Sequence, residues 1–116
     1  MQYMLLIYEE EAVWTSLTAE ERSVSADRYR EFARRMLDEG RLHAGEGLEL
    51  TSTATSVRKT GDRVVFTDGP FAETKEQLGG FFLIEARDLD QAMEDAASIS
   101  TRDTEIIEIR PVMGTS

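Results

Sequence analysis

The sequence predicts an α+β protein in which helices cover one face of a sheet. Two segments are apolar at successive positions, as inner strands covered on both faces are: Met4–Tyr8, and Phe81–Ala86 through Ile84. Two others, 29–37 and 89–97, repeat apolar residues at helical spacing. Strand and helix patterns alternate without a linker, repeat or low-complexity stretch, so we expect one domain over residues 1–116.

The amino-acid composition excludes some classes of function and disfavours others. The chain has 116 residues, 41% of them hydrophobic, which is enough for one core. Its 13 basic and 23 acidic residues give a net charge of −10, which disfavours nucleic acids and anionic membranes as partners. The absence of cysteine excludes disulfides and thiolate chemistry. Because the first residues lack a basic start and a long apolar run, we expect a cytoplasmic protein without a membrane span.

The first half of the chain begins with a central strand at Met4–Tyr8. Thr18 and Glu21 have capping-box spacing, so a helix is expected to begin near Thr18. It is expected to end near Glu39, before the left-handed terminator Gly40; a break near Val24 and Ser25 is compatible with the pattern. The apolar stripe of this helix consists of Tyr29, Phe32, Ala33, Met36 and Leu37.

A short strand and a hairpin follow. Leu42–Glu46 has strand character, but Gly45 and Gly47 indicate a bend or a close approach of backbone. The segments 53–60 and 63–67 are rich in Thr and Val and flank Gly61 and Asp62, which is typical of a β-hairpin. The prolyl ring at residue 70 then interrupts strand structure.

The last third contains two strands and a helix. After the strand at Phe81–Ala86, residues 88–91 carry a second capping signal, and the apolar stripe behind it contains Leu89, Ala92, Met93, Ala96 and Ala97. Glu105–Arg110 alternates apolar and charged residues, as an edge strand does, and ends at Pro111. Right-handed crossovers place both helices on one face of the sheet. The other face would expose a large apolar patch, so we expect a homodimer packed sheet to sheet.

Residues 68–76 read DGPFAETKE and continue into LGGFFLIE at 78–85. This segment resembles the signature of the DGPF-type branch of the YCII-related family, and the similarity extends over nearly the whole chain. The resemblance implies a ferredoxin-like βαβ(ββ)βαβ sandwich that forms a dimeric α/β barrel. It also implies a fold similar to that of muconolactone isomerases, a relation to a dehydrochlorinase of one branch, and genes placed beside extracytoplasmic-function sigma factors. A helix histidine proposed for proton transfer in the wider family falls at or near Tyr29, a poor base at neutral pH.

The DGPF segment itself permits two interpretations. In the structural one, Asp68 caps a turn, Gly69 adopts a restricted backbone angle, Pro70 begins a helical turn and Phe71 anchors it in the core. In the functional one, carboxylates and an amine gather beside a barrel mouth, where desolvation and the amine would give the acids opposite proton roles. The residues of that second interpretation are Asp68, Glu73, Lys75 and Glu76.

His43 is the sole histidine, and one imidazole among carboxylates is a weak metal site, so no metal is expected. It is either a structural or solvent-exposed residue or a ligand contact. The glycines around Glu46 lack the strand-to-helix context of a phosphate loop, so nucleotide binding is discounted.

Two functions follow from the sequence. The first is a small-molecule pocket protein, at its most specific a cofactor-independent isomerase or lyase-like enzyme. Its catalytic candidates are Asp68, Glu73 and Lys75, and its ligand-binding candidates are Tyr29, His43, Gly69, Pro70, Phe71 and Glu76. The alternative is a non-catalytic partner of an extracytoplasmic-function sigma factor, with Glu9, Glu10 and Glu11 meeting a basic surface.

Overall fold

The structure is a computed structural model that describes residues 1–99 and 102–115. Its elements follow one another as β1 (Gln2–Glu9), α1 (Glu11–Ser16), α2 (Ala19–Asp38), β2 (Leu42–Gly47), the 3₁₀ helix η1 (Thr51–Thr53), β3 (Thr55–Thr60), β4 (Arg63–Asp68), β5 (Gln77–Glu85), α3 (Leu89–Ile99) and β6 (Ile106–Pro111). This order confirms the α+β class. It also adds α1 and η1, which the sequence patterns did not predict.

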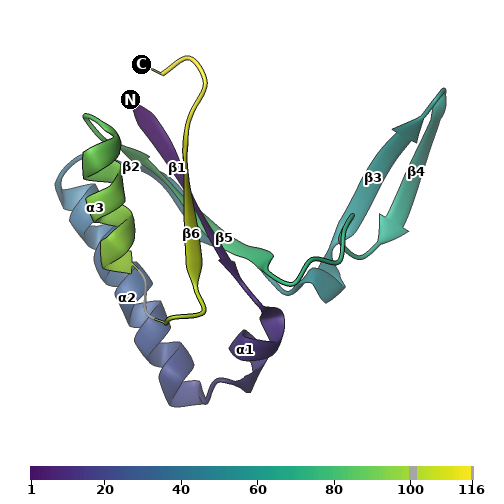
Figure 1. Ribbon diagram of the computed structural model, residues 1–116, viewed down its shortest axis with the longest axis horizontal. Coiled ribbons are helices and arrows are strands. Elements are labelled where there is room, and N and C mark those ends of the chain that lie inside the picture. Colours follow the sequence, from purple (N-terminus) through teal and green to yellow (C-terminus); the bar gives the residue numbers. More distant parts are fainter. Residues whose placement is uncertain (100–101, 116) are drawn as a thin grey trace.

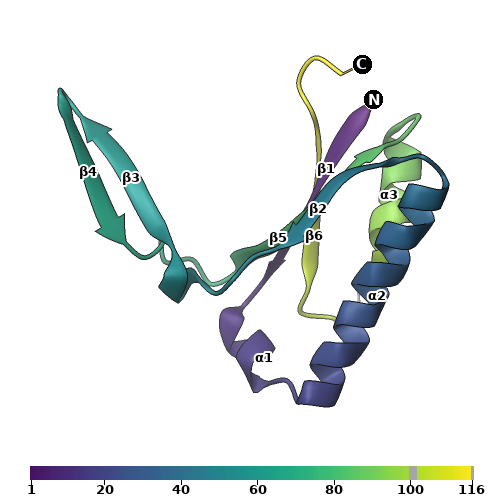
Figure 2. The same ribbon diagram turned by 180° about the vertical axis from the view of Figure 1, so that it is seen from behind.

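Four strands form one antiparallel sheet in the order β2-β5-β1-β6, which is compatible with a ferredoxin-like fold. The helices α2 and α3 lie together on one side of this sheet, and β3 and β4 form a separate two-stranded hairpin on the other side (Figure 1, Figure 2). The predicted inner strands β1 and β5 pair with each other, and β6 is an edge strand as expected.

The core lies between the sheet and the two long helices. In β1, the residues Tyr3, Leu5 and Ile7 are buried against the helices, whereas the alternate residues are half-buried on the open face. The rings of Phe32 in α2 and Phe82 in β5 meet edge to face, with centroids 4.9 Å apart. Alternation along β1 therefore directs one apolar set into the core and leaves the other set on the open face.

Helix α2 begins with the predicted capping box. The Glu21 amide donates to Thr18 Oγ1 at 3.1 Å, and the Thr18 amide donates to Glu21 Oε1 at 2.8 Å. Gly40 ends the helix region with φ +70°. The break considered near Val24 and Ser25 is wrong, because α2 is continuous there and the buried Ser25 hydroxyl accepts a hydrogen bond from an arginine across the core.

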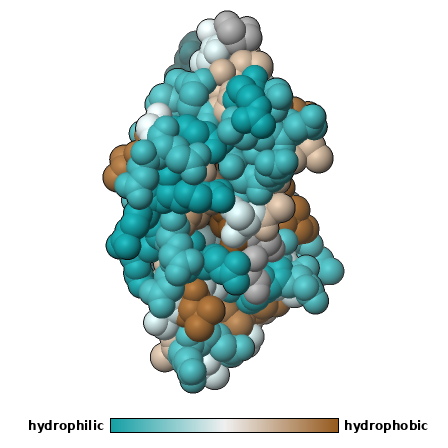
Figure 3. Space-filling view, turned by 90° about the vertical axis from the view of Figure 1, so that its left-hand side faces the viewer, coloured by the Kyte–Doolittle hydropathy of each residue, from teal (hydrophilic) through white to brown (hydrophobic). Residues whose placement is uncertain are grey.

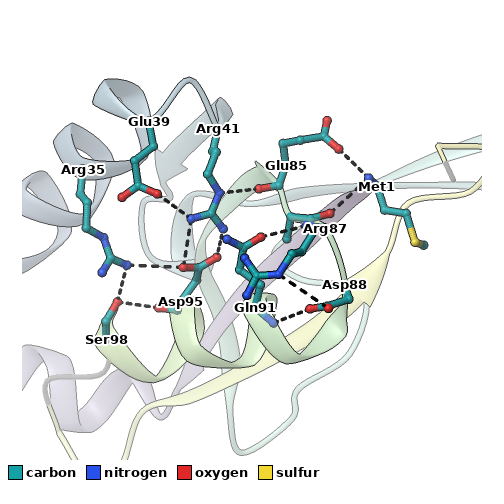
Figure 4. A network of polar contacts seen from close by, with 11 residues as sticks. Met1, Arg35, Glu39, Arg41, Glu85, Arg87, Asp88, Gln91, Asp95 and Ser98 are labelled. Atoms are coloured by element: carbon teal, nitrogen blue, oxygen red, sulfur yellow. Dashed lines mark hydrogen bonds and ion pairs between the residues drawn. The ribbon is translucent and has the colours of Figure 1, made fainter.

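The far end of α2 is joined to β2, β5 and α3 by a network around Arg41 (Figure 4). The Arg41 guanidinium bonds to both Asp95 carboxylate oxygens in α3, to Glu39 at 2.9 Å and to the Glu85 carbonyl oxygen at 2.9 Å. Asp95 is buried, and Arg35 lies 3.6 Å from it. The outer surface of the helix layer is mostly hydrophilic (Figure 3). The two helices therefore expose mainly polar residues to solvent.

Gly45 in β2 confirms the predicted close approach. A Cβ at Gly45 would lie 2.5 Å from the Phe82 ring, whereas a Cβ at Gly47 would meet nothing within 4 Å. The close approach is therefore found at Gly45, whereas a side chain at Gly47 would point into open space. The absence of a side chain at Gly45 lets the edge strand lie over a core ring.

The hairpin β3–β4 confirms the predicted turn, with Gly61 at φ +60°. In the segment after it, Gly69 has φ +98°, as the structural interpretation requires. The expected anchoring of Phe71 in the core is wrong, because this ring is 86% exposed. The helical turn expected from Pro70 is also wrong, since bends follow it. The loop that carries Phe71 lies outside the core, so its ring is exposed to solvent.

Candidate functional site

A cavity of about 400 Å³, here called the main cavity, opens where β1, β2 and β5 approach α1 and α2. Its walls are largely apolar. The apolar side chains that line it include Trp14, Leu48, Leu50, Leu78, Phe81 and Phe82. A concave space of this size, with apolar walls and a few polar groups, has the character of a small-molecule site.

One end of the main cavity carries a polar group of residues, here called the Arg102 cluster, that consists of Glu9, Ser25, Tyr29, Arg102 and Glu105. The Tyr29 hydroxyl donates a hydrogen bond to Glu105 Oε2. Arg102 donates to the same Glu105 oxygen at 3.1 Å, to both Glu9 carboxylate oxygens at 2.9 and 2.7 Å, and to Ser25 Oγ. One cation therefore bridges two carboxylates that the sheet brings to the same end.

The Arg102 cluster fixes protonation states. Burial raises the pKa of Tyr29 strongly, and the hydrogen bond to Glu105 raises it further, so this hydroxyl stays a neutral donor. Burial alone would raise the pKa of Glu9, but the bonds from Arg102 and Thr104 outweigh it and the pKa is lowered. The bond to Glu9 raises the pKa of Arg102, which keeps its charge. The cluster thus sets a neutral hydroxyl at the end of the cavity, donated to Glu105, whose side chain is fully buried.

The structure places the residues singled out in the sequence at three different locations. Tyr29 lines the main cavity. Four of the candidate residues in the DGPF segment line a second, more open hollow against α1 and η1; they are Gly69, Pro70, Glu73 and Lys75. Lys75 is largely exposed, and its Nζ lies 3.3 Å from Glu10. Asp68, Phe71 and Glu76 line neither space.

His43 lies at the third location, on the open face of the sheet. Its Nε2 is 3.1 Å from Glu85 Oε1, and the amino group of Met1 lies 2.6 Å from the other oxygen of that carboxylate. Within one copy of the chain, His43 is therefore not brought together with Tyr29 or with the DGPF segment. No group of three or more metal-binding side chains forms among the residues that the structure describes.

The acidic residues at the end of β1 form ion pairs and hydrogen bonds within the chain. Glu9 binds Arg102, Glu10 pairs with Lys75, and Glu11 accepts bonds from the amide and hydroxyl of Thr51 at 2.8 and 2.5 Å. In the described part of the chain, no helix is long and apolar enough to cross a membrane.

The sequence reasoning missed Glu9, Arg102 and Glu105 as members of one site. A signal for two of them was present: the predicted strands at Met4–Tyr8 and Glu105–Arg110 both border a glutamate. Antiparallel pairing of Tyr8 with Ile106 sets these two glutamates at the same end of the sheet. Arg102, which lies outside every predicted element, had no such signal.

The fold and the cavity together define a small α+β protein with a two-helix layer on an antiparallel sheet and a largely apolar cavity at one sheet end. The chain belongs to the YCII-related domain family, whose family model matches residues 1–116. This confirms the resemblance to that family. An uncharacterised protein of Rhizobium meliloti (strain 1021) is 35% identical over 119 residues, which cover 97% of this chain and 92% of that protein.

Proposed function

We propose that this chain binds a small, largely apolar molecule in the main cavity. The observation that carries the proposal is the combination of apolar walls with the Arg102 cluster at one end. Apolar walls supply affinity through burial, and a few fixed polar groups orient the ligand. The Arg102 cluster, most of whose members line the cavity, is the polar group that would orient it.

The charges around the cavity favour a neutral or cationic ligand. Five carboxylates line it, at Glu9, Glu11, Glu46, Glu49 and Glu105, against two guanidinium groups, at Arg30 and Arg102. Because like charge disfavours an anion in an apolar space, an anionic ligand would have to displace Glu9 or Glu105 from Arg102.

The more specific form of the proposal is a cofactor-independent isomerase or lyase-like enzyme. A carboxylate that lines the cavity would take a proton from a carbon of the ligand. In an isomerisation it would return the proton to another carbon, and in an elimination a leaving group would depart from the adjacent carbon with its bonding electrons. Tyr29, whose hydroxyl proton is donated to Glu105, would hold that carboxylate in place. Glu73 and Lys75 stay candidates for chemistry only at the second hollow, whereas Asp68 lines neither space and stays a candidate from the sequence alone.

A neutral fluorescent probe, N-phenyl-1-naphthylamine, tests the binding proposal. Leu50→Trp fills the cavity, and Leu89→Trp places the same side chain on an exposed part of α3 as a matched control. We expect saturable binding to the original chain, a dissociation constant at least about tenfold higher for Leu50→Trp, and a change below about twofold for the control. Unsaturable binding to the original chain, or equal binding to both variants, would overturn the proposal.

We also propose the sheet-to-sheet homodimer, in which two open faces close a barrel. It is supported by an apolar set on the open face, namely Met4, Leu6, Tyr8, Phe81, Leu83 and Ile106, of which Ile106 is 51% exposed. In sedimentation equilibrium we expect Leu83→Lys to give monomers and Met93→Lys, on the exposed side of α3, to leave the dimer intact. A dimer that persists in Leu83→Lys would contradict this packing.

The alternative, a non-catalytic partner of an extracytoplasmic-function sigma factor, is supported by the net charge of −10. The three carboxylates that would carry it are already bound within the chain, so we rank it second. Steeply salt-dependent binding to such a factor is its test.

A further inference from the structure

The hairpin β3–β4, residues 55–68 and here called the arm, extends away from the rest of the molecule (Figure 1, Figure 2). It lies beyond the side of the sheet opposite to α2 and α3. No residue of this fully described segment is buried. A two-stranded hairpin standing alone in water is marginally stable at best, so the arm needs a surface to pack against.

One face of the arm carries three of its four apolar side chains, together with Thr55, Lys59 and Asp68. Val57 pairs with Phe66 and Lys59 with Val64, so Val57, Val64 and Phe66 share this face. These three side chains are 63%, 55% and 69% exposed. The opposite face carries Arg58 next to Val65 together with hydroxyl side chains. An exposed apolar strip on one face with a polar opposite face is typical of an interface.

The charge of the arm indicates its partner. The arm carries three basic residues and two acidic ones, so its net charge is 3 − 2 = +1, and the rest of the chain carries −10 − 1 = −11. These residues are Arg58, Lys59, Arg63, Asp62 and Asp68. An acidic surface complements the arm, and the remainder of a second copy provides one.

The position of the arm also indicates a second copy of the chain as its partner. The open face of the sheet and the arm lie on the same side of the molecule (Figure 2). A second copy seated on the open face would therefore lie beside the arm, which at strand spacing is about 20 Å long. One partner would thus cover both unpartnered apolar surfaces.

We infer that the arm of each copy clasps a second copy of this chain, with Val57, Val64 and Phe66 packed against that copy and Lys59, on the same face, directed toward its carboxylates. The inference rests on the homodimer proposed above and adds to its sheet-to-sheet contact. Two related arms would enclose the dimer from both ends.

A substitution series tests the clasp in the full chain. The triple variant Val57→Thr, Val64→Thr and Phe66→Thr removes the apolar face while retaining residues that favour strands. Val65→Thr makes the same kind of change on the opposite face. We expect sedimentation equilibrium to show a dimer dissociation constant at least about tenfold higher for the triple variant and within about twofold for Val65→Thr.

A crosslinking experiment keeps the inference testable if the triple variant is poorly folded. The chain has no cysteine, so Lys59→Cys gives one attachment point for a photoreactive benzophenone beside the intact apolar face. We expect crosslinks between isotopically distinct copies, from the arm of one to the remainder of the other. Crosslinks within one copy only, or a dimer of unchanged affinity in a folded triple variant, overturn the clasp and leave the sheet-to-sheet dimer standing. A monomeric original chain overturns both.

Discussion

Arg102 is the residue on which the polar end of the main cavity depends. It holds Glu9 at the end of β1 and Glu105 before β6, and its guanidinium lies 5.5 Å from the centre of the Trp14 ring. Two carboxylates brought together in a partly buried place would repel each other without this cation. The arginine therefore bridges the two carboxylates and stabilises this end of the sheet.

Tyr29→Phe isolates the hydroxyl of this cluster. The loss of its bond to Glu105 is expected to lower the free energy of unfolding by about 1 kcal/mol. Tyr3→Phe is the matched control, because among the described residues the Tyr3 hydroxyl donates to the Met1 sulfur, a weak acceptor, at 3.6 Å. Urea denaturation of both variants measures the difference, and equal losses would contradict a structural role for the Tyr29 hydroxyl.

Glu9 is expected to contribute to acid sensitivity. Its pKa in the folded chain lies below its ordinary value of 4.5, so as the pH falls the unfolded chain takes up the proton first. The stabilisation is present above that value and is lost as the pH falls through the folded pKa. In urea denaturation series between about pH 5 and pH 3, Glu9→Gln should show a shallower loss of stability than the original chain. An unchanged slope would rule out this contribution.

Residues that act locally were predictable from the sequence, and those that act across the fold were not. The Thr18–Glu21 box and the terminator Gly40 depend on neighbours a few positions away, and both are confirmed. Arg102 depends on Glu9, which is 93 positions distant. The DGPF motif is conspicuous in the sequence, yet Phe71 is exposed because nothing local specifies where a loop lies.

At the scale of elements, the contact of β2 with the core requires glycine at position 45. Gly45→Ala would place a methyl group against the buried Phe82 ring and is expected to cost about 1–3 kcal/mol. Gly47→Ala, two residues further along the same strand, meets open space and should cost below about 1 kcal/mol. Thermal or urea denaturation compares them, and equal costs would show that the ring moves freely.

The Arg41 network joins four elements, and Asp95 is its buried carboxylate. Asp95→Ala would leave the Arg41 guanidinium, whose side chain is 14% exposed, without its main partner, at a cost of about 2–3 kcal/mol. Asp90→Ala, at an exposed position in the first turn of α3, is the control. If the two variants are equally stable, the network contributes little.

Elements with strong periodicity were predicted, and short ones were missed. The stripe that contains Phe32 and Met36 placed α2 correctly, although Leu37 is 65% exposed and so does not belong to the core. Helix α1, Glu11–Ser16, has no buried residue and no side-chain cap, so no pattern marks it. Its Trp14 nevertheless forms part of the main cavity wall.

For the whole molecule, the arm is expected to be dispensable for the fold of one chain. The Gly69 amide donates to the Ala54 carbonyl oxygen at 2.7 Å, so the two ends of the arm already meet. Replacing residues 55–68 by Gly-Ser should preserve the near-ultraviolet circular dichroism of Trp14 and the core tyrosines while weakening the dimer. Loss of the native signal would show that the arm supports its own chain.

The class of the whole fold was predictable because the order of strand and helix patterns permits few arrangements. The location of the cavity was not, since it lies among α1, α2 and the ends of three strands that are distant in sequence. The sequence placed its candidate acids in one local segment, 68–76, whereas the structure gathers a different set, Glu9, Arg102 and Glu105, from both ends of the chain.

The position of β1 in the middle of the sheet has a consequence for biosynthesis. Its two neighbours, β5 and β6, both come from the last third of the chain. The apolar strand β1 therefore leaves the ribosome first and stays unpaired until almost all of the polypeptide has been translated. Until β1 is inserted between β5 and β6, a nascent chain is most exposed to chaperone binding and to aggregation.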